Sequence, residues 1–226
     1  MANWHRSAEE QWNSFSESWA KDSVAMWENG SRKKIIPLME KWIMPGAKVA
    51  DLGCGDGYGS FRLADKGFQV TGIDLSGKMI EEARRRGSLN GIQFLQGDLV
   101  QIPVETNSFD GIMAINSLEW VEVPFRALDE IKRIVKPGGY ALFGILGPTA
   151  GPRKYNSFRR LYGEEVIMNT MQPWEFQRLA EENGWELKDE QMVEKRKGNC
   201  EALSGLPFDL QQALSFMWLF MFKNAE

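Results

Sequence analysis

Apolar runs and helical patterns alternate along the central part of the chain, between residues 48 and 146. Short runs of apolar residues predict five strands, at residues 49–52, 68–73, 92–95, 109–115 and 140–146. Between them, apolar residues recur with the 3.6-residue period of a helix, at residues 61–66, 76–87 and 124–135. Strands that alternate with helices are typical of a parallel sheet with helices on both faces.

The pattern changes after residue 146, where glycine and proline are frequent up to residue 152. A helix is predicted from Pro173 to Asn183, followed by strands at residues 186–195 and 217–222 that pair antiparallel. These elements predict an α/β fold with a doubly wound, Rossmann-like, seven-stranded sheet. The sheet is expected to be mostly parallel, with one antiparallel C-terminal strand and an N-terminal helical extension.

The first 45 residues are rich in aromatic side chains. Their apolar positions fall at near-helical spacings, at Trp12, Phe15, Trp19, Met26 and Trp27. This spacing predicts one or two amphipathic helices before the main fold. A further helix is predicted around residues 35–43, with Ser31 as a candidate cap and Pro37 marking a kink or a later start.

The composition is that of an ordinary soluble globular protein, because 43% of the 226 residues are hydrophobic and 26% are charged. The two cysteines, Cys54 and Cys200, exclude a disulfide scaffold. The single histidine, His5, excludes zinc sites built on two or three histidines, so we expect no metal. We expect His5 itself to lie in a disordered terminus.

Charge and hydropathy argue against two other classes of partner. A net charge of −4 disfavours nucleic-acid binding driven by charge. The longest apolar run, residues 216–222, is far shorter than the about 18–20 residues that cross a bilayer, and the first ten residues lack a secretory signal. We therefore expect a cytoplasmic protein with no membrane span.

A glycine-rich loop, VADLGCGDG at residues 49–57, includes and follows the first predicted strand. Glycines there permit a tight turn and close approach of a ligand, and the next helix presents unpaired N–H groups. Asp74 ends the second strand, 21 positions after Gly53. A carboxylate at that place can accept hydrogen bonds from both ribose hydroxyls, so the two features together indicate a nucleoside site.

The glycine spacing argues against a dinucleotide, whose fingerprint is Gly-x-Gly-x-x-Gly. Tyr58 occupies the third glycine position, and Gly57 stands one place early. Asp51 lies two residues before Gly53, where a carboxylate favours a cationic ligand over an anionic pyrophosphate. S-adenosylmethionine carries a sulfonium and an ammonium and therefore suits the loop better. An NAD-dependent Rossmann enzyme stays as an alternative.

Five sequence blocks resemble the class I S-adenosylmethionine-dependent methyltransferases, in particular the small-molecule branch with the ubiquinone- and menaquinone-biosynthesis-like enzymes. The blocks are VADLGCGDG (49–57), VTGIDLS (70–76), FLQGDLVQIP (94–103), FDGIMAINSLEWV (109–121) and IKRIVKPGGYALF (131–143). They occur in the family's order and spacing, whereas residues 1–45 and 147–226 resemble the family only loosely. The resemblance implies an enzyme that binds S-adenosylmethionine, releases S-adenosylhomocysteine and methylates a small molecule.

The resemblance also implies cofactor contacts. The loop Gly53-Cys54-Gly55 would face the methionine part of the cofactor, which Asp51 would orient, and Asp74 would hold the ribose hydroxyls. The alternatives are local: Asp51 can satisfy its own turn, and Asp74 can cap the following helix.

Further blocks carry the other cofactor candidates. Leu75 would pack on the adenine. In the turn Gly97-Asp98-Leu99, the carboxylate of Asp98 would accept from the adenine amino group, and the N–H of Leu99 would serve a ring nitrogen. The alternative for Asp98 is a plain surface loop. Asn116 would lie near the methionine ammonium and the methyl group.

Other candidates concern the acceptor. Glu119 is a candidate general base, or a grip for a cationic acceptor, at a position where related enzymes often carry histidine or another polar residue. Its alternative is a solvated loop residue. Trp19, Trp27 and Trp120 are candidates for pocket lining, and Arg32 is a candidate for the cofactor carboxylate. A basic group is interpreted as a solvated face or as an attractor for an acidic substrate: Arg153, Lys154, Arg159 and Arg160.

The chain is expected to divide into two parts. Residues 1–45 would form a helical lid or extension, and residues 46–226 a Rossmann-like methyltransferase domain, with residues 147–172 as a candidate acceptor-pocket insertion. Methyl transfer would be an in-line displacement, with catalysis mainly by positioning. A module that binds S-adenosylmethionine without catalysis is the second alternative, and the sequence does not identify the acceptor.

Overall fold

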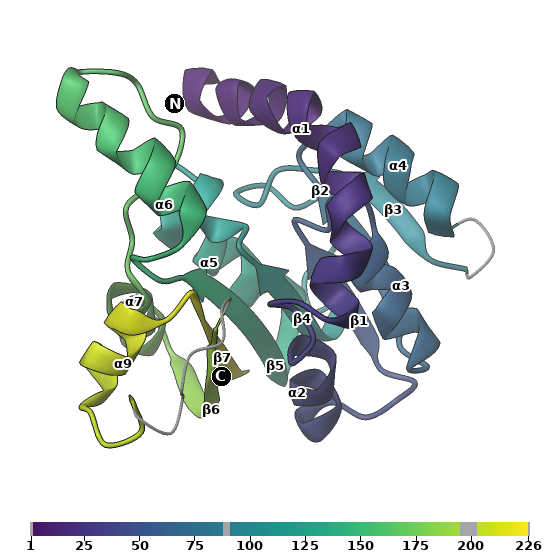
Figure 1. Ribbon diagram of the computed structural model, residues 1–226. Coiled ribbons are helices and arrows are strands. Elements are labelled where there is room, and N and C mark those ends of the chain that lie inside the picture. The colour runs from purple at the N-terminus through teal and green to yellow at the C-terminus, as the bar shows by residue number, and fades with distance from the viewer. Residues whose placement is uncertain (1, 88–90, 195–202, 226) are drawn as a thin grey trace.

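The computed structural model describes residues 2–87, 91–194 and 203–225, which are built around one seven-stranded sheet (Figure 1). The strands are β1 (Lys48–Leu52), β2 (Gln69–Asp74), β3 (Gln93–Gln96), β4 (Phe109–Ile115), β5 (Val135–Leu146), β6 (Trp185–Val193) and β7 (Met217–Asn224). Their order across the sheet is β3-β2-β1-β4-β5-β7-β6. Strand β7 runs antiparallel to both β5 and β6, and all other pairs are parallel. The predicted fold class is confirmed.

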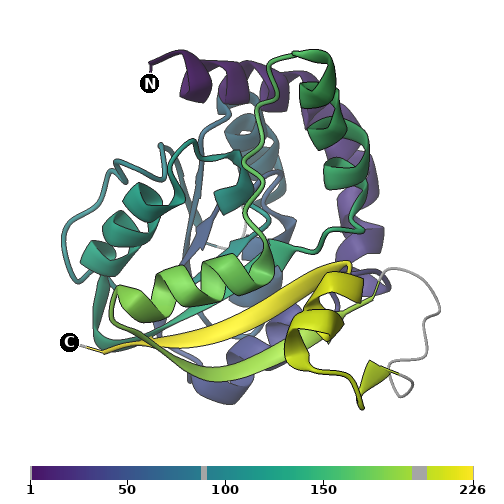
Figure 2. The ribbon, with the colours of Figure 1, turned by 90° about the vertical axis from the view of Figure 1, so that its left-hand side faces the viewer.

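Helices cover both faces of the sheet, which Figure 2 shows from the side of β6. On one face, α5 (Pro124–Ile134) and α7 (Pro173–Glu182) pack on the larger core cluster. On the other face lie α2 (Ile35–Trp42), α3 (Tyr58–Asp65) and α4 (Gly77–Gly87). This double covering explains the nearly continuous apolar runs of the central strands, which are buried on both sides.

Aromatic side chains fill the core where the antiparallel strand joins the sheet. Phe143 on β5 packs edge-on against Phe176 on α7 and Trp185 on β6, with ring centroids 4.9 and 5.9 Å apart. Phe222 on β7 completes the cluster at 6.2 Å from Phe143. Such edge-to-face pairs add to the stabilisation that apolar burial already provides.

The N-terminal segment forms a single long helix, α1 (Ala2–Glu28), which packs on α3 and α4. Figure 1 and Figure 2 both show it changing direction near its middle. There, the hydroxyls of Ser14, Ser16 and Ser18 donate to carbonyls three residues earlier. Local bonds of this kind compete with the regular helical pattern and are often found where helices bend.

The structure decides two predictions about the helix that follows α1. Ser31 does not cap it, because Lys34 stands at the N-cap of α2 without a side-chain bond. Pro37 marks a later start and not a kink, since α2 begins at Ile35 and Pro37 falls in its first turn, where a missing N–H is tolerated.

Several short helices lie in segments where no element was predicted. They are η1 (Leu118–Trp120), α6 (Gly151–Asn156), η2 (Ser157–Tyr162) and α9 (Phe208–Leu214). Lys195, at the end of a predicted strand, and Cys200 lie outside the described residues. None of the helices in the described part of the chain is long and apolar enough to cross a membrane.

The strand order reverses beside β1. The chain moves outward from β1 through β2 to β3, then returns to place β4 on the other side of β1. The loops that leave the carboxyl ends of β1 and β4 therefore diverge to opposite faces and leave a crevice between them. This is the place where open parallel sheets bind ligands.

Gly57 ends the loop after β1 in a position that only glycine suits. Its φ is 75°, and an added Cβ would lie 2.8 Å from Cβ of Ala83 and 2.9 Å from the ring of Phe94. We predict that Gly57→Ala lowers the free energy of unfolding by about 3 kcal/mol, through left-handed strain and overpacking together.

The matched control is Gly163→Ala, where φ is 76° and nothing lies within 4 Å of the added Cβ. It should cost only the backbone term of about 1–2 kcal/mol. Urea unfolding of both variants measures the difference, and equal costs would contradict the packing argument.

Candidate functional site

A pocket of about 1160 Å³, including its open mouth, lies at the carboxyl ends of the strands beneath α1. Its walls come from α1, from the turn that follows it, and from the loops after β1, β2, β3, β4 and β5. The lining residues are His5, Trp12, Trp19, Met26, Ser31, Arg32, Gly53, Gly55, Asp74, Leu75, Met79, Asp98, Leu99, Ile115, Asn116, Ser117, Trp120, Val121, Leu146, Pro152 and Phe216. Most of them are apolar or aromatic, with a few polar groups, as is typical of small-molecule sites.

The glycine loop forms the floor of the pocket and is held by the end of β2. The carbonyl of Ile73 accepts from the N–H groups of Gly53 and Cys54, at 2.7 and 3.1 Å. The carboxylate of Asp74 accepts from the N–H groups of Gly55 and Ser76, at 2.8 and 2.9 Å. Each oxygen of Asp74 keeps a further acceptor position for a ligand hydroxyl. Burial raises the pKa of Asp74 to about 6.

The helix after Asp74 is capped as predicted. The hydroxyl of Ser76 accepts from the N–H of Met79 at 3.1 Å, which leaves Asp74 free of that task.

Asp51 lies behind the loop and not on the pocket surface. Its Oδ2 accepts from the hydroxyl of Ser60 at 2.6 Å, and the residue is 4% exposed. Burial raises the pKa of Asp51 to about 7, although the hydrogen bond of Ser60 and the charge of Arg32 act in the opposite direction. The carboxyl therefore titrates close to neutral pH and responds to any charge placed in the pocket.

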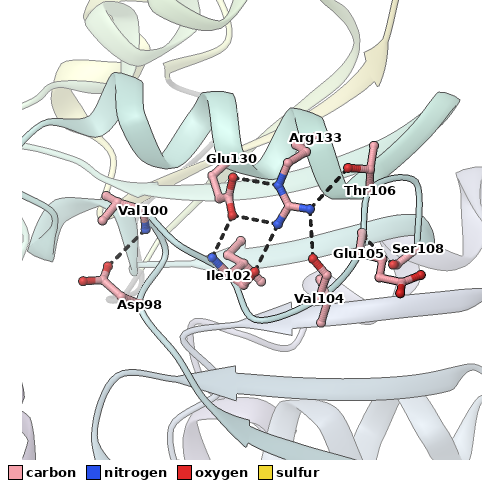
Figure 3. Close-up of polar contacts among 9 residues, drawn as sticks. All are labelled: Asp98, Val100, Ile102, Val104, Glu105, Thr106, Ser108, Glu130 and Arg133. Carbon is pink, nitrogen blue, oxygen red and sulfur yellow. Dashed lines mark hydrogen bonds and ion pairs between the residues drawn. The ribbon is translucent and has the colours of Figure 1, made fainter.

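The loop after β3 carries Asp98 to one end of the pocket. Side chains of α5 hold this loop through hydrogen bonds (Figure 3). The guanidinium of Arg133 donates to the carbonyls of Ile102 and Val104, at 3.0 and 2.9 Å. Its ion-pair partner Glu130 accepts from the N–H of Ile102 at 2.8 Å. Asp98 accepts from the N–H of Val100 at 3.0 Å. Arg133 and Glu130 thus fix the loop that presents Asp98.

His5 is part of α1 and pairs with Asp98 through its Nδ1, so the prediction of a disordered terminal residue is wrong. The reason is that α1 crosses the pocket mouth and carries His5 over the loop after β3. The indole of Trp4 donates to the carbonyl of Trp120 at 2.8 Å, and the hydroxyl of Ser76 donates to Asn13 at 2.6 Å. These bonds attach α1 to both sides of the pocket.

Three tryptophans form an aromatic wall over the glycine loop. Trp12 packs edge-on against Trp19 and Trp120, with centroid distances of 5.4 and 4.9 Å. An added Cβ at Gly55 would lie 3.1 Å from the indole nitrogen of Trp19, so the indole rests directly on the loop. Trp19 and Trp120 line the pocket as expected, whereas Trp27 does not. Trp27 is 5% exposed and packs in the core with α2.

Arg32 is a half-buried cation on the pocket wall. Its guanidinium lies 4.9 Å from the ring centroid of Trp19 and 5.5 Å from that of Trp27. Burial lowers the pKa of Arg32 to about 10, so the group stays charged at neutral pH. Among the described residues no hydrogen-bond acceptor engages the guanidinium, and an anionic ligand would supply one.

Glu119 is fully buried, so the alternative of a solvated loop residue is wrong. Its Oε1 accepts from the N–H of Leu146 at 2.6 Å, and it does not line the pocket. Burial raises the pKa of Glu119, while the neighbouring Arg153 opposes that shift. The catalytic role proposed for Glu119 stays a prediction, and its observed contact is a support for the end of β5.

Arg153 also departs from its predicted solvated state, because only 4% of it is exposed. Its Nε donates to the carbonyl of Leu146 at 2.9 Å, and a second nitrogen donates to the carbonyl of Met171. A carboxylate and a guanidinium therefore hold both polar groups of Leu146. Arg159 and Arg160 are exposed, as predicted for the basic group.

The predicted cofactor residues fall into two sets. Those that line the pocket are Gly53, Gly55, Asp74, Leu75, Asp98, Leu99, Asn116 and Arg32. Those that lie behind its surface are Asp51, Cys54 and Gly97. Gly97 packs on Pro103, whose ring an added Cβ would meet at 2.6 Å.

Part of the chain is similar in sequence to known methyltransferases. Residues 50–143 match the family described as Methyltransferase domain. The chain is 36% identical over 125 residues to the demethylmenaquinone methyltransferase of Renibacterium salmoninarum, covering 55% of this chain and 50% of that protein. It is 32% identical over 115 residues to the malonyl-[acyl-carrier protein] O-methyltransferase of Enterobacter lignolyticus, covering 51% and 45%. The chain thus spans about half the length of these relatives.

The fold is also similar to that of a solved methyltransferase structure. A crystal structure of a SAM-dependent methyltransferase from Methanosarcina mazei superposes with a TM-score of 0.65 at 20% sequence identity, covering 83% of this chain and 97% of that one. The chain thus has the Rossmann-like fold of that structure, and residues 50–143 match a methyltransferase domain, as the sequence resemblance implied.

We predict that Arg153→Met destabilises the protein strongly, because the carbonyls of Leu146 and Met171 would lose their charged donor and Glu119 would lose a neighbouring positive charge. Two buried acceptors left without a donor cost about 2–6 kcal/mol together. Urea unfolding measures the loss, and Arg160→Met, at an exposed position, should leave the free energy of unfolding almost unchanged.

The double variant Glu119→Gln with Arg153→Met tests the cause. Removing both charges should recover part of the lost stability. A double variant no more stable than Arg153→Met alone would show that the two charges are not coupled.

Proposed function

We propose that this protein is an S-adenosylmethionine-dependent methyltransferase that acts on a small-molecule acceptor. The observation that carries the proposal is the position of Asp74. Its carboxylate shapes the glycine loop at the strand-order reversal and keeps acceptor positions directed to the pocket. The methyltransferase family match and the SAM-dependent structural relative support the same donor.

The residues present suit this cofactor. Asp74 would accept from the ribose hydroxyls, with Leu75 against the adenine. Asp98 and the N–H of Leu99 would face the adenine edge, where His5 already contacts Asp98. Gly53 and Gly55 line the pocket and would face the methionine part, at a place where an added side chain would meet Ser117 or Trp19.

Charged groups at the other end of the pocket suit the amino-acid part of the cofactor. Arg32 is a half-buried guanidinium with no hydrogen-bond acceptor among the described residues, and it would hold the carboxylate. Asp51 lies behind Gly53, where its charge would favour the ammonium and the sulfonium. Asn116 would approach the ammonium and the methyl group from the end of β4.

When bound, S-adenosylmethionine supplies a methyl group already activated on a sulfonium. The residues of this chain then have three tasks. The glycine loop and Arg32 fix the direction of the methyl group, α1 and its tryptophans exclude water, and the walls after β4 and β5 align the acceptor. Positioning of this kind needs no strong base unless the acceptor must lose a proton.

The helical extension is proposed as a lid. Residues 1–45 contribute His5, Trp12, Trp19, Met26 and Arg32 to the pocket, so they enclose the site. Residues 147–172 contribute Pro152 and are proposed as a wall for the acceptor. The two curated relatives act on different acceptors by their names, so they do not select one for this chain.

The two alternatives make different predictions. An NAD-dependent Rossmann enzyme would bind a nicotinamide cofactor, whose pyrophosphate would lie near the buried acids of the glycine loop. A module without catalysis would bind S-adenosylmethionine and transfer its methyl group to no acceptor. Calorimetric titration with S-adenosylmethionine, S-adenosylhomocysteine and NAD separates the first case, and the absence of binding by the two adenosyl compounds would disprove the proposed function.

We predict that Asp74→Ala weakens binding of S-adenosylhomocysteine by about 10- to 100-fold, since hydrogen bonds to a charged carboxylate are lost. Isothermal titration calorimetry measures the change. Asp129→Ala on α5, exposed and away from the pocket lining, is the control and should bind as the unmodified protein does. Unchanged affinity in a folded Asp74→Ala variant would remove the ribose assignment.

The raised pKa of Asp51 predicts a pH dependence of cofactor binding. A cationic ligand favours the ionised carboxylate, so it lowers the pKa from about 7 and releases a proton on binding. Affinity for S-adenosylmethionine should therefore rise with pH by about tenfold across the range from about 6 to 8. Titration calorimetry in buffers of different ionisation enthalpy counts the released protons.

Asp51→Asn is the matched control for this effect. It removes the titrating group and keeps an oxygen that can accept from Ser60. The pH dependence attributed to Asp51 is the part that the variant lacks. An identical pH profile in both proteins would exclude Asp51 as its source.

A further inference from the structure

The part of the pocket beyond the glycine loop has apolar walls. They are formed by Met26, Ile115, Trp120, Leu146, Pro152 and Phe216. These residues come from α1, the end of β4, η1, the end of β5, α6 and the residue before β7. If the proposed function holds, this is where the acceptor lies, and its body must be apolar to match such walls.

The titratable groups that line the described part of this pocket all have other tasks. Asp74 accepts from two backbone N–H groups, and Asp98 accepts from Val100 and contacts His5. Arg32 is a cation and cannot take up a proton. Glu119 and Asp51 are buried behind the surface and do not line the pocket. His5 is the other titratable group on the described lining, and its Nδ1 is paired with Asp98. An acceptor that arrives already ionised needs no deprotonation by any of these groups.

Two polar side-chain atoms of the lining residues have no hydrogen-bond partner in the described structure. They are Nδ2 of Asn116 and Oγ of Ser117, which are consecutive residues after β4. An unpartnered buried donor costs about 1–3 kcal/mol, so a ligand that satisfies both would gain that energy.

The backbone carbonyls of Asn116 and Ser117 already accept hydrogen bonds from Trp120. The indole of Trp120 donates to the carbonyl of Asn116 at 3.0 Å, and the N–H of Trp120 donates to the carbonyl of Ser117 at 3.2 Å. Asn116 adopts a left-handed φ of 56°, which is uncommon for a residue other than glycine. Ser117 is 8% exposed and touches Gly53, where an added Cβ would lie 2.5 Å from its own. The two donors thus lie beside the glycine loop that would hold the methyl donor.

We propose that the acceptor is an apolar organic oxyanion, whose oxygen is held by Asn116 and Ser117 and whose oxygen is methylated. The oxyanion is a carboxylate or an acidic hydroxyl, both deprotonated at neutral pH. An oxygen lone pair forms the new O–C bond, the C–S bond breaks, and its electron pair stays on sulfur. The sulfonium and the oxyanion become a neutral thioether and a neutral ester or ether, so no proton is transferred.

The first test compares head groups on one apolar body. Octanoate, octylamine and octanol are titrated into the complex with S-adenosylhomocysteine, and binding is followed by the fluorescence of the pocket tryptophans. A parallel arm uses 4-nitrophenol against nitrobenzene for the acidic hydroxyl. We expect octanoate or 4-nitrophenolate to bind about tenfold more tightly than its uncharged or cationic counterparts. Equal or tighter binding of octylamine or octanol, or no binding of either oxyanion at millimolar concentration, would overturn the proposal.

The second test uses Ser117→Ala, which removes only the hydroxyl at this crowded position. Binding of S-adenosylhomocysteine should stay within about twofold, while binding of the preferred oxyanion weakens by about 5- to 10-fold. Ser16→Ala, buried in α1 outside the pocket lining, is the control and should change neither. The reverse result, with weaker S-adenosylhomocysteine binding and unchanged oxyanion binding, would assign Ser117 to the cofactor and contradict the proposal.

This inference rests on the proposed function, and the two can fail separately. Loss of the function would appear as no binding of S-adenosylmethionine or S-adenosylhomocysteine. Failure of the inference alone would leave that binding intact and show a preference for an amine or a neutral alcohol. Methyl octanoate or 4-nitroanisole formed from S-adenosylmethionine would support both.

Discussion

The end of β2 is the point on which the site depends. The carbonyl of Ile73 and the carboxylate of Asp74 together accept four backbone N–H groups, three of them from the glycine loop. Gly53 and Gly55 take left-handed conformations that other residues rarely adopt, and these bonds stabilise the turn. Without the carboxylate the loop would lose the acceptor of the Gly55 N–H, and α4 would lose a contact at its start. The same group thus shapes the floor of the pocket and faces into it.

The aromatic N-terminal helix completes what the sheet alone leaves open. A strand-order reversal provides a crevice, but it does not close one, since both loops diverge from it. Helix α1 crosses this crevice and is attached by side-chain bonds at Trp4, Asn13 and Ser23 to three separate parts of the core. The tryptophans of the N-terminal segment therefore have distinct places: Trp12 and Trp19 line the pocket, whereas Trp27 packs in the core.

The local sequence pattern predicts most of the fold. It also predicts the residues that lie close in sequence to the glycine loop. The strands, the antiparallel position of β7 and the cap at Ser76 follow from apolar periodicity and capping chemistry, which depend on neighbours along the chain. A solvated position is the alternative for Glu119 and one of the two interpretations of Arg153, because charged residues are usually exposed. Their burial results from contacts with residues 27 and 18 positions away, at Leu146 and Met171 respectively, which no local pattern contains. His5 was missed for the same reason, since its partner Asp98 is 93 positions away.

The apolar walls and the charges of the reactants belong together. Transfer of a methyl cation equivalent from a sulfonium to an oxyanion removes both charges, so the transition state is less polar than the reactants. A pocket of low dielectric constant stabilises dispersed charge relative to separated charges, provided that binding brings both ions in. In the proposed function, Arg32 would face the carboxylate of the donor, and Asp51, once ionised, would favour its ammonium. For the proposed acceptor, Asn116 and Ser117 would then need to supply only orientation, and two neutral donors would suffice because such an acceptor arrives already ionised.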